Sequence, residues 1–327
     1  MKNYNFIAIG DTVIDAFIKL KEAEIQTDGG KSKICMRFAD KIPYEDVFIV
    51  PAVGNSANVA VSAARLGIIS ALVANIGDDY FGKECLDVFT AEGVGTEFIT
   101  SHKGRKTNYH YVLWYGSDRT ILVKHETYQY MLPDIGTPSW IYLSSLGENS
   151  LDFHKQIEAY LRDRPGIKLA FQPGTYQMKF GVEKMKGIYQ RTEVFFCNKE
   201  EAQRILETKE DNIKKLMQEI AALGPKIVAI TDGVNGAYAH DGTNTWMIPL
   251  YPDPKPPLQR TGAGDAFSST FTIALVLGKS VEEALMWGPV NSMSVVQGIG
   301  ARGGLLTRAQ LEEYLAIAPV EYKVSAI

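Results

Sequence analysis

The sequence predicts an α/β fold of three layers, in which helices cover both faces of a mostly parallel central sheet and a small β-sheet forms a lid. From residue 140 onward, short apolar runs alternate with segments of helical periodicity, and this alternation is typical of parallel sheets. Two earlier segments, 12–50 and 105–127, instead alternate polar and apolar residues around glycine-containing turns, which indicates half-exposed β-structure. We expect these two inserts to form the lid of a single domain spanning residues 1–327.

The elements of the central layers follow in order along the chain. Residues 5–10 form a short apolar run that ends at Gly10, as expected of a buried strand. Residues 55–67 place small and aliphatic side chains at helical spacing and stop at Gly67, which predicts a helix. The same criteria predict buried strands at 70–77, 140–147, 168–174, 194–201 and 226–233, antiparallel strands within 236–250, and helices at 80–94, 151–163, 213–224, 264–277 and 281–297. The last two helices are expected to close the chain.

Composition argues against several classes of partner. The 327 residues carry a net charge of −4 and a pI of about 5.8, whereas nucleic-acid-binding proteins usually have a basic surplus. No signal-peptide pattern is present, and the apolar run "FTIALVLG" is too short to cross a bilayer. The cysteines are odd in number and far apart, so we expect reduced thiols that fill the core: Cys35, Cys85 and Cys197. These observations predict a cytoplasmic protein without a nucleic-acid or membrane partner.

The stretch "TGAGDAF", residues 261–267, combines an anion-binding pattern with a carboxylate. The small residues Gly262, Ala263 and Gly264 precede an apolar helix, whose unpaired first-turn N–H groups are open to an anion. Asp265 follows directly, and its simplest role is to cap the helix. A carboxylate beside a phosphate is repelled, however. The two features agree if Asp265 accepts the proton of a substrate hydroxyl while the amides stabilise a transferring phosphoryl group.

This stretch resembles the C-terminal signature of the ribokinase, or PfkB, family of carbohydrate and nucleoside kinases, which commonly reads D-T-x-G-A-G-D. Other segments resemble family motifs and occur in family order: "VGNSANVAVSAARLG" (53–67), "NIGDDYFG" (75–82), "NKEE" (198–201) and "ITDGVNGAY" (230–238). The resemblance runs from residue 5 to about residue 305. It implies a ribokinase-like three-layer α/β/α sandwich with a lid, and a kinase that uses ATP and Mg²⁺ to phosphorylate a hydroxymethyl group of a sugar.

The resemblance also implies roles for individual residues around the reacting atoms. It makes Asp265 the catalytic base, and it assigns the anion hole to the amides of Gly262, Ala263 and Gly264. Substrate hydroxyls are expected to contact Asp15, Gly54, Asn55 and Asn58. Asp11 is a rival to Asp15 for this role. The structural alternatives are a turn-capping Asp15 and a helix capped by Asn55 or Ser56.

For the nucleotide, the resemblance implies contacts with Asn198, Thr231, Gly233, Gly236 and Gly264. Glu201 is expected to organise Mg²⁺, partly through water, and one carboxylate together with waters and phosphates suits that ion. The alternative for Asn198 and Glu201 is a helix start with a solvated acidic turn.

The sequence departs from the family pattern in three places. Val53-Gly54 stands where the family often has Gly-Gly. Gln259 replaces the Asp that usually leads the C-terminal signature and that supports a monovalent-cation site in several relatives, so the resemblance does not carry K⁺ activation over to this chain. The loop "PDPKPPLQR" before the signature is charged and rich in proline; either its Lys255 or Arg260 contacts phosphate, or the loop is simply solvated.

Alternatives to a sugar kinase remain at this stage. The aromatic-bearing lid suits a nucleoside, and a non-catalytic binding protein could keep the fold, although such a protein gains nothing from a base beside an anion hole.

"GIGARG", residues 298–303, satisfies G-x-G-x-x-G but follows a helix, so we reject a dinucleotide site. The five histidines show no metal-ligand spacing, and we expect most of them to be superficial or structural. Pairing of lids into a homodimer is a further implication of the resemblance.

Overall fold

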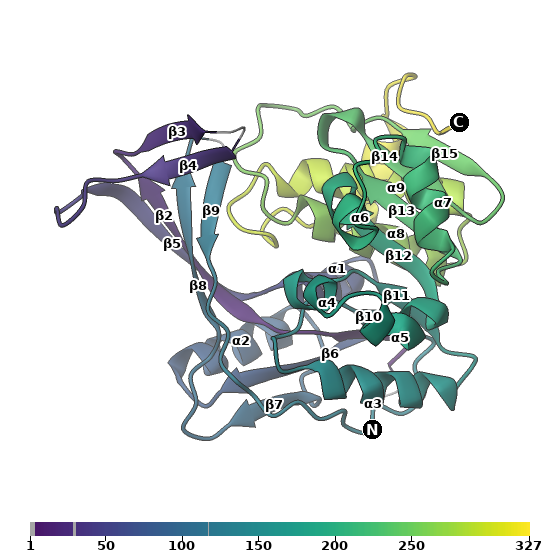
Figure 1. Cartoon of the computed structure of the whole chain (residues 1–327), viewed down its shortest axis with the longest axis horizontal. Helices are drawn as coiled ribbons and strands as arrows, with labels where there is room; N and C mark the ends of the chain where they lie inside the picture. Colours follow the sequence, from purple (N-terminus) through teal and green to yellow (C-terminus); the bar gives the residue numbers. More distant parts are fainter. Residues whose placement is uncertain (1–3, 29–30, 117) are drawn as a thin grey trace.

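The computed structural model describes residues 4–28, 31–116 and 118–327, and it is built around a large central sheet (Figure 1). The strand order is β16-β15-β14-β13-β12-β11-β10-β1-β6-β7. Pairing is parallel from β7 to β13 and antiparallel from β13 to β16. The bounds are β1 (Phe6–Ile9), β6 (Ser70–Gly77), β7 (Ile99–His102), β10 (Trp140–Leu143), β11 (Lys168–Phe171), β12 (Thr192–Asn198), β13 (Ile227–Thr231), β14 (Ala237–His240), β15 (Thr245–Ile248) and β16 (Ser325–Ala326).

Helices cover both faces of this sheet, as the alternating pattern predicts. Along β1, Phe6 and Ala8 pack into one hydrophobic core, while Ile7 and Ile9 pack into the other, because successive side chains of a strand point to opposite faces. The first core is closed by α1 (Asn55–Arg65), α2 (Tyr80–Ala91), α8 (Ala263–Val276), α9 (Val281–Val295) and α10 (Arg308–Ala316). The second is closed by α3 (Leu151–Arg162), α5 (Lys186–Arg191), α6 (Lys199–Ile205) and α7 (Ile213–Ala221). The three-layer prediction is confirmed.

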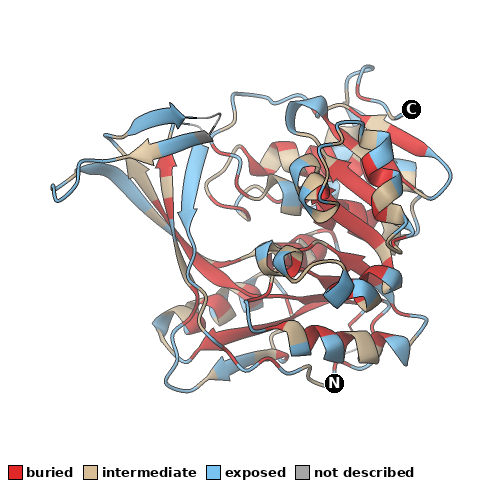
Figure 2. Ribbon diagram, in the orientation of Figure 1, coloured by how far each residue is buried: buried red, intermediate tan, exposed pale blue. Residues whose placement is uncertain are grey.

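The two predicted inserts meet in one four-stranded lid sheet of order β5-β2-β8-β9. Its strands are β2 (Val13–Leu20), β5 (Tyr44–Val53), β8 (Tyr109–Tyr115) and β9 (Asp118–Leu122). β2 pairs with β8 in parallel register, and this pairing joins the two sequence segments. The lid projects from the body of the molecule, and many of its residues are exposed (Figure 2).

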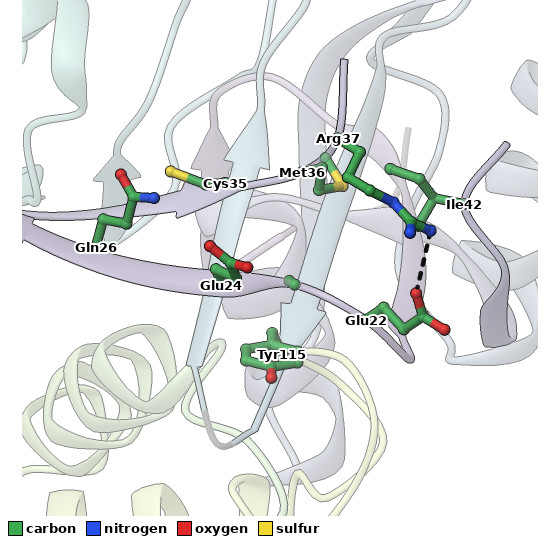
Figure 3. A pocket seen from close by; sticks show the side chains of 9 residues that line it. Glu22, Glu24, Gln26, Cys35, Met36, Arg37, Ile42 and Tyr115 are labelled. Carbon is green, nitrogen blue, oxygen red and sulfur yellow. Dashed lines mark hydrogen bonds and ion pairs between the residues drawn. The ribbon is translucent and has the colours of Figure 1, made fainter. Parts of the chain in front are cut away.

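A separate hairpin, β3 (Glu24–Asp28) with β4 (Lys31–Cys35), extends the lid. The hairpin, the residues next to it and Tyr115 line a cavity of about 480 Å³, where Arg37 pairs with Glu22 at 3.5 Å (Figure 3). Cys35 lines this cavity and is half-buried, so the prediction that it fills the core is wrong. Cys85 and Cys197 are buried in the two cores, as predicted.

The structure corrects some element boundaries. The strand predicted at 194–201 ends at Asn198, because a capping box between Asn198 and Glu201 starts α6 there. The chain does not close with α9, since α10 and β16 follow it. Short elements that the pattern did not indicate include α4 (Thr175–Phe180), α5 and β7. Within the ranges that the structure describes, every helix is too short or too polar to span a membrane.

Candidate active site

Asp265 lies in the first turn of α8, where two cavities meet. The first cavity, of about 480 Å³, opens toward the lid and is lined by residues that include Asp15, Asn58 and His110. The second, of about 250 Å³, extends toward the ends of β12 and β13. Three residues line both cavities: Asn55, Gly262 and Asp265. This carboxyl group can therefore contact ligands on either side.

Side-chain amides surround the Asp265 carboxylate. Its Oδ1 accepts hydrogen bonds from Asn55 Nδ2 at 3.0 Å and Gln172 Nε2 at 3.3 Å. Its Oδ2 accepts one from Asn58 Nδ2 at 2.8 Å. Burial raises the pKa of Asp265 to about 6, against the lowering effect of the hydrogen bonds from Asn58 and Gln172, and the nearby charge of Glu201 raises it further. The group is therefore mostly ionised at neutral pH but is a stronger base than an ordinary carboxylate.

The start of α8 presents free backbone donors beside Asp265. Gly262 is the N-cap residue, has left-handed backbone with φ 83°, and provides no side-chain cap. The first-turn N–H groups that follow have no partner within a helix. At Gly264 a Cβ would meet no atom within 4 Å, so the approach to these groups is open. Because Gly262 and not Asp265 occupies the cap position, simple capping does not account for the carboxylate.

The first cavity distinguishes the two early aspartates. Asp11 accepts hydrogen bonds from the Tyr130 hydroxyl at 2.8 and 3.0 Å. Asp15 Oδ1, in contrast, lies 3.5 Å from His110 Nδ1 and is buried without a hydrogen bond. Asp15 therefore keeps an acceptor for a ligand, whereas Asp11 is already engaged in the fold.

Unpaired polar atoms concentrate in this cavity. Among the described residues, seven buried side-chain polar atoms have no hydrogen-bond partner, and five of them belong to residues that line it: Asp15 Oδ1, Asn58 Oδ1, His110 Nε2, His125 Nδ1 and Thr261 Oγ1. Leaving such an atom unpaired costs about 1–3 kcal/mol. His110 and His125 line this cavity, and the sequence pattern did not single them out as site residues.

The residues of the 54–58 segment that are predicted to contact the substrate also line the first cavity. The N-cap residue of α1 is Gly54, which makes no side-chain cap bond, so neither Asn55 nor Ser56 caps this helix. The Asn55 side chain donates to Asp265, while Ser56 Oγ donates to the Ile9 carbonyl. Gly54 has φ 119°, and a Cβ there would meet the Asp11 carbonyl oxygen at 2.6 Å, so no larger residue fits.

Some, but not all, of the residues predicted to contact the nucleotide line the second cavity. Asn198, Glu201, Thr231 and Gly264 line it. Gly233 and Gly236 are not among its lining residues, and a Cβ at Gly236 would collide with the Ile248 carbonyl oxygen, which gives that glycine a packing role. Asn198 and Glu201 do form a helix start, with hydrogen bonds of 2.8 and 2.9 Å between them, and they face the cavity as well.

Two arginines add positive charge to the second cavity. Arg119 comes from lid strand β9, and Arg260 precedes the α8 turn. Neither forms an ion pair with the part of the chain that the structure describes. Burial lowers the pKa of Arg119 against the raising effect of the Asp118 charge, and the charge of Arg260 lowers it further. Two like charges facing one cavity favour an anion between them. Lys255, the other sequence candidate, does not line the cavity.

Comparison with known proteins identifies the family. The model of the pfkB family carbohydrate kinases matches residues 48–308. The chain belongs to this family. Ribokinase of Bacillus subtilis is 28% identical over 280 residues, which cover 80% of this chain and 87% of that protein. The structure of Arabidopsis thaliana ribokinase, complexed with ribose and ATP, has a TM-score of 0.79 at 18% identity and covers 96% of this chain and 99% of its own. Methanocaldococcus jannaschii nucleoside kinase has a TM-score of 0.76 at 17% identity, with the same coverage.

The pfkB family match confirms the predicted family, fold and class of enzyme: the protein is a kinase that phosphorylates an alcohol group. The two arginines and the open N–H groups at the start of α8 would suit phosphate groups in the second cavity. The side chain of Glu201 offers one carboxylate there, and no group of three or more metal-ligating side chains occurs in the described ranges. A single carboxylate together with phosphate oxygens and waters is a normal Mg²⁺ environment.

Proposed function

We propose that this kinase transfers the γ-phosphoryl group of ATP to a hydroxymethyl group of a sugar. The observation that carries the proposal is the position of Asp265, between a cavity rich in unpaired polar atoms and a cavity with free helix amides. A base must contact the acceptor hydroxyl while the anion hole contacts the phosphoryl group. Asp265 and the amides of residues 262–264 meet both requirements.

The composition of the first cavity favours a polyol. Its unpaired atoms include the acceptors Asp15 Oδ1 and Asn58 Oδ1, and hydroxyl groups can donate to such atoms. The aromatic residues that line it are Tyr176 and the two histidines, and the Tyr176 ring contacts His125 edge-on at 5.8 Å. A nucleobase gains much of its binding free energy from stacking on an aromatic face. We therefore place sugars ahead of nucleosides.

The residues of this chain perform the transfer as follows. Asn55, Asn58 and Gln172 hold the Asp265 carboxylate in place. One of its oxygens accepts the proton of the substrate hydroxyl as the new O–P bond forms and the bond from the γ-phosphorus to the ADP oxygen breaks. The amides of Gly262, Ala263 and Gly264 stabilise the negative charge of the transferring group.

The second cavity holds the donor in this proposal. Arg119 and Arg260 contact its phosphates, and Asn198 and Glu201 hold Mg²⁺, directly or through water. When bound, this ion neutralises phosphate charge. Because Arg119 lies on the lid strand β9, its contact with the nucleotide draws the lid over the substrate. The closed lid excludes water, which would otherwise compete with the sugar for the phosphoryl group. The whole chain acts as one kinase domain with this lid.

A coupled ADP-release assay tests the proposal. Mg-ATP is offered with a panel of hexoses, pentoses and nucleosides, and each active substrate is repeated with Asp265→Asn. We expect at least one sugar to give turnover that the variant loses. Turnover with nucleosides alone would replace the sugar by a nucleoside. Ligand-induced thermal shifts without any ADP release would indicate a binding protein and overturn the proposal.

The role of Asp15 is tested with the sugar that this panel identifies. Asp15→Asn is expected to lower kcat/KM by about tenfold to a hundredfold, mainly through KM, because a hydrogen bond to a charged group contributes about 1.5–3 kcal/mol. Asp46→Asn is a matched control, since Asp46 is exposed on β5 of the same lid sheet. Equal KM values for the two variants would remove Asp15 from the substrate site.

The pKa of Asp265 predicts a shifted pH dependence. The protonated carboxyl cannot accept a proton, and burial raises its pKa to about 6. We therefore expect kcat/KM, measured from pH 4.5 to 8, to fall about tenfold per unit below roughly pH 6 and to level off above it. An acid limb centred near pH 4, the ordinary value of a carboxyl group, would contradict the environment described for Asp265.

A further inference from the structure

The side chain of Gln259 is buried and bonds to three backbone groups around the anion hole. Its Nε2 donates to the carbonyl oxygens of Gly298 at 3.0 Å and Gly300 at 3.4 Å. Its Oε1 accepts from the N–H of Thr261 at 2.7 Å. One neutral amide thus satisfies two acceptors and one donor, which only a group with both functions can do.

The segment that Gln259 holds packs against the anion hole. Residue 301 follows the second carbonyl partner, and Ala301 lies so close to Gly262 that a Cβ on the glycine would collide with it. Thr261, the third partner, directly precedes Gly262. The Gln259 amide therefore connects the 298–301 segment to the turn that aims the amides of residues 262–264.

An aspartate at this position would meet a different environment. Its oxygens are acceptors only, and they would face two carbonyl oxygens across a buried space. Such an arrangement is unfavourable unless a cation lies among the oxygens. The resemblance implies this kind of monovalent-cation site for relatives that carry Asp. The residues of this chain do not fit it, because an N–H group points where the positive charge would be required.

We propose that Gln259 is a positioning residue that replaces the monovalent cation, so that this chain forms its anion hole without K⁺. The Gln259 side-chain N–H group takes the place of the cation, because it donates to the carbonyl oxygens of Gly298 and Gly300 whichever salt is present. The catalytic part of this inference rests on the proposed kinase activity. The structural part is independent of that activity: it says that the apo protein needs no cation to order the 298–301 segment.

The first test compares salts on the wild-type protein. Turnover and thermal midpoint are measured in KCl, NaCl and tetramethylammonium chloride at one ionic strength of about 0.1 M, so that screening is constant. We expect the wild type to vary less than about twofold in kcat/KM, and its thermal midpoint to be the same in all three salts. A severalfold activation or a higher midpoint in KCl alone would overturn the proposal.

The second test is Gln259→Asp, which removes the N–H donor and shortens the side chain enough to leave room for an ion. We expect kcat to fall about tenfold or more in tetramethylammonium chloride, since one misplaced oxyanion donor can cost a factor of about 10² to 10³. K⁺ or Na⁺ should restore turnover and raise the thermal midpoint of the apo variant. A variant that is active and indifferent to the salt would contradict the proposal.

Two further variants separate this role from general packing. Gln259→Leu removes both functions, so it should lose turnover that no cation restores; rescue by K⁺ would contradict the proposal. Gln218→Asp makes the same change at an exposed position of α7, outside these contacts. It should show no dependence on the cation. If the wild type phosphorylates nothing, the proposed function fails, while the thermal midpoints of the wild type and Gln259→Asp still decide the structural part.

Discussion

Replacing Asp265 by asparagine is expected to lower kcat by about two to four orders of magnitude, the range that a positioned general base contributes. Asparagine keeps the size of the side chain and one acceptor for Asn55 or Asn58, but it cannot take the proton of the substrate hydroxyl. Sugar binding should largely survive, because Asp15 and the other unpaired polar atoms of the cavity are untouched. The loss should therefore appear in kcat and not in KM.

The measurement is steady-state kinetics together with a direct binding titration of the sugar. Asp152→Asn is a suitable control, because Asp152 is a first-turn acidic residue of α3, away from both cavities. If first-turn carboxylates matter only through the helix dipole, both variants should lose a little stability and keep their turnover. A normal kcat for Asp265→Asn would remove the base from the mechanism.

The sequence predicts the parts of the site that local motifs carry. "TGAGDAF" places Asp265 and the proposed anion hole at one helix start, and α8 begins within that motif, at Ala263. The alternation in the two inserts predicts strands that the structure joins into one lid. In both cases the physical cause is short-range, because helix starts and strand faces depend on residues close together in the chain.

Residues that reach the site through tertiary packing have no such signal. Gln172 follows β11 and donates to Asp265 from 93 residues away in the chain. His110 faces Asp15 because β2 and β8 pair in parallel, and nothing near His110 indicates this pairing. Gly233 and Gly236 differ from these residues, because a motif match suggests that they contact the nucleotide, yet they do not line the second cavity; their contact with a nucleotide stays a prediction.

Gly262 combines two constraints that a single methyl group would violate. Its φ of 83° lies in the left-handed region, where a side chain costs about 1–2 kcal/mol. A Cβ there would also collide with Ala301. Relief of that collision must move either the 298–301 segment or the turn that aims the first amides of α8. We therefore expect Gly262→Ala to lower kcat by about 10² to 10³, as the loss of an oxyanion donor does.

The opposite end of the same helix provides the control. Gly278 has φ 80°, almost the same backbone strain, but a Cβ there would meet no atom within 4 Å. Gly278→Ala should therefore lose about 1–2 kcal/mol of unfolding free energy, measured by denaturant titration, with kcat unchanged. Gly262→Ala should lose at least as much stability and, in addition, its turnover. If the two variants had the same kcat, strain alone would explain the glycine, and the contact between Gly262 and Ala301 would have no part in catalysis.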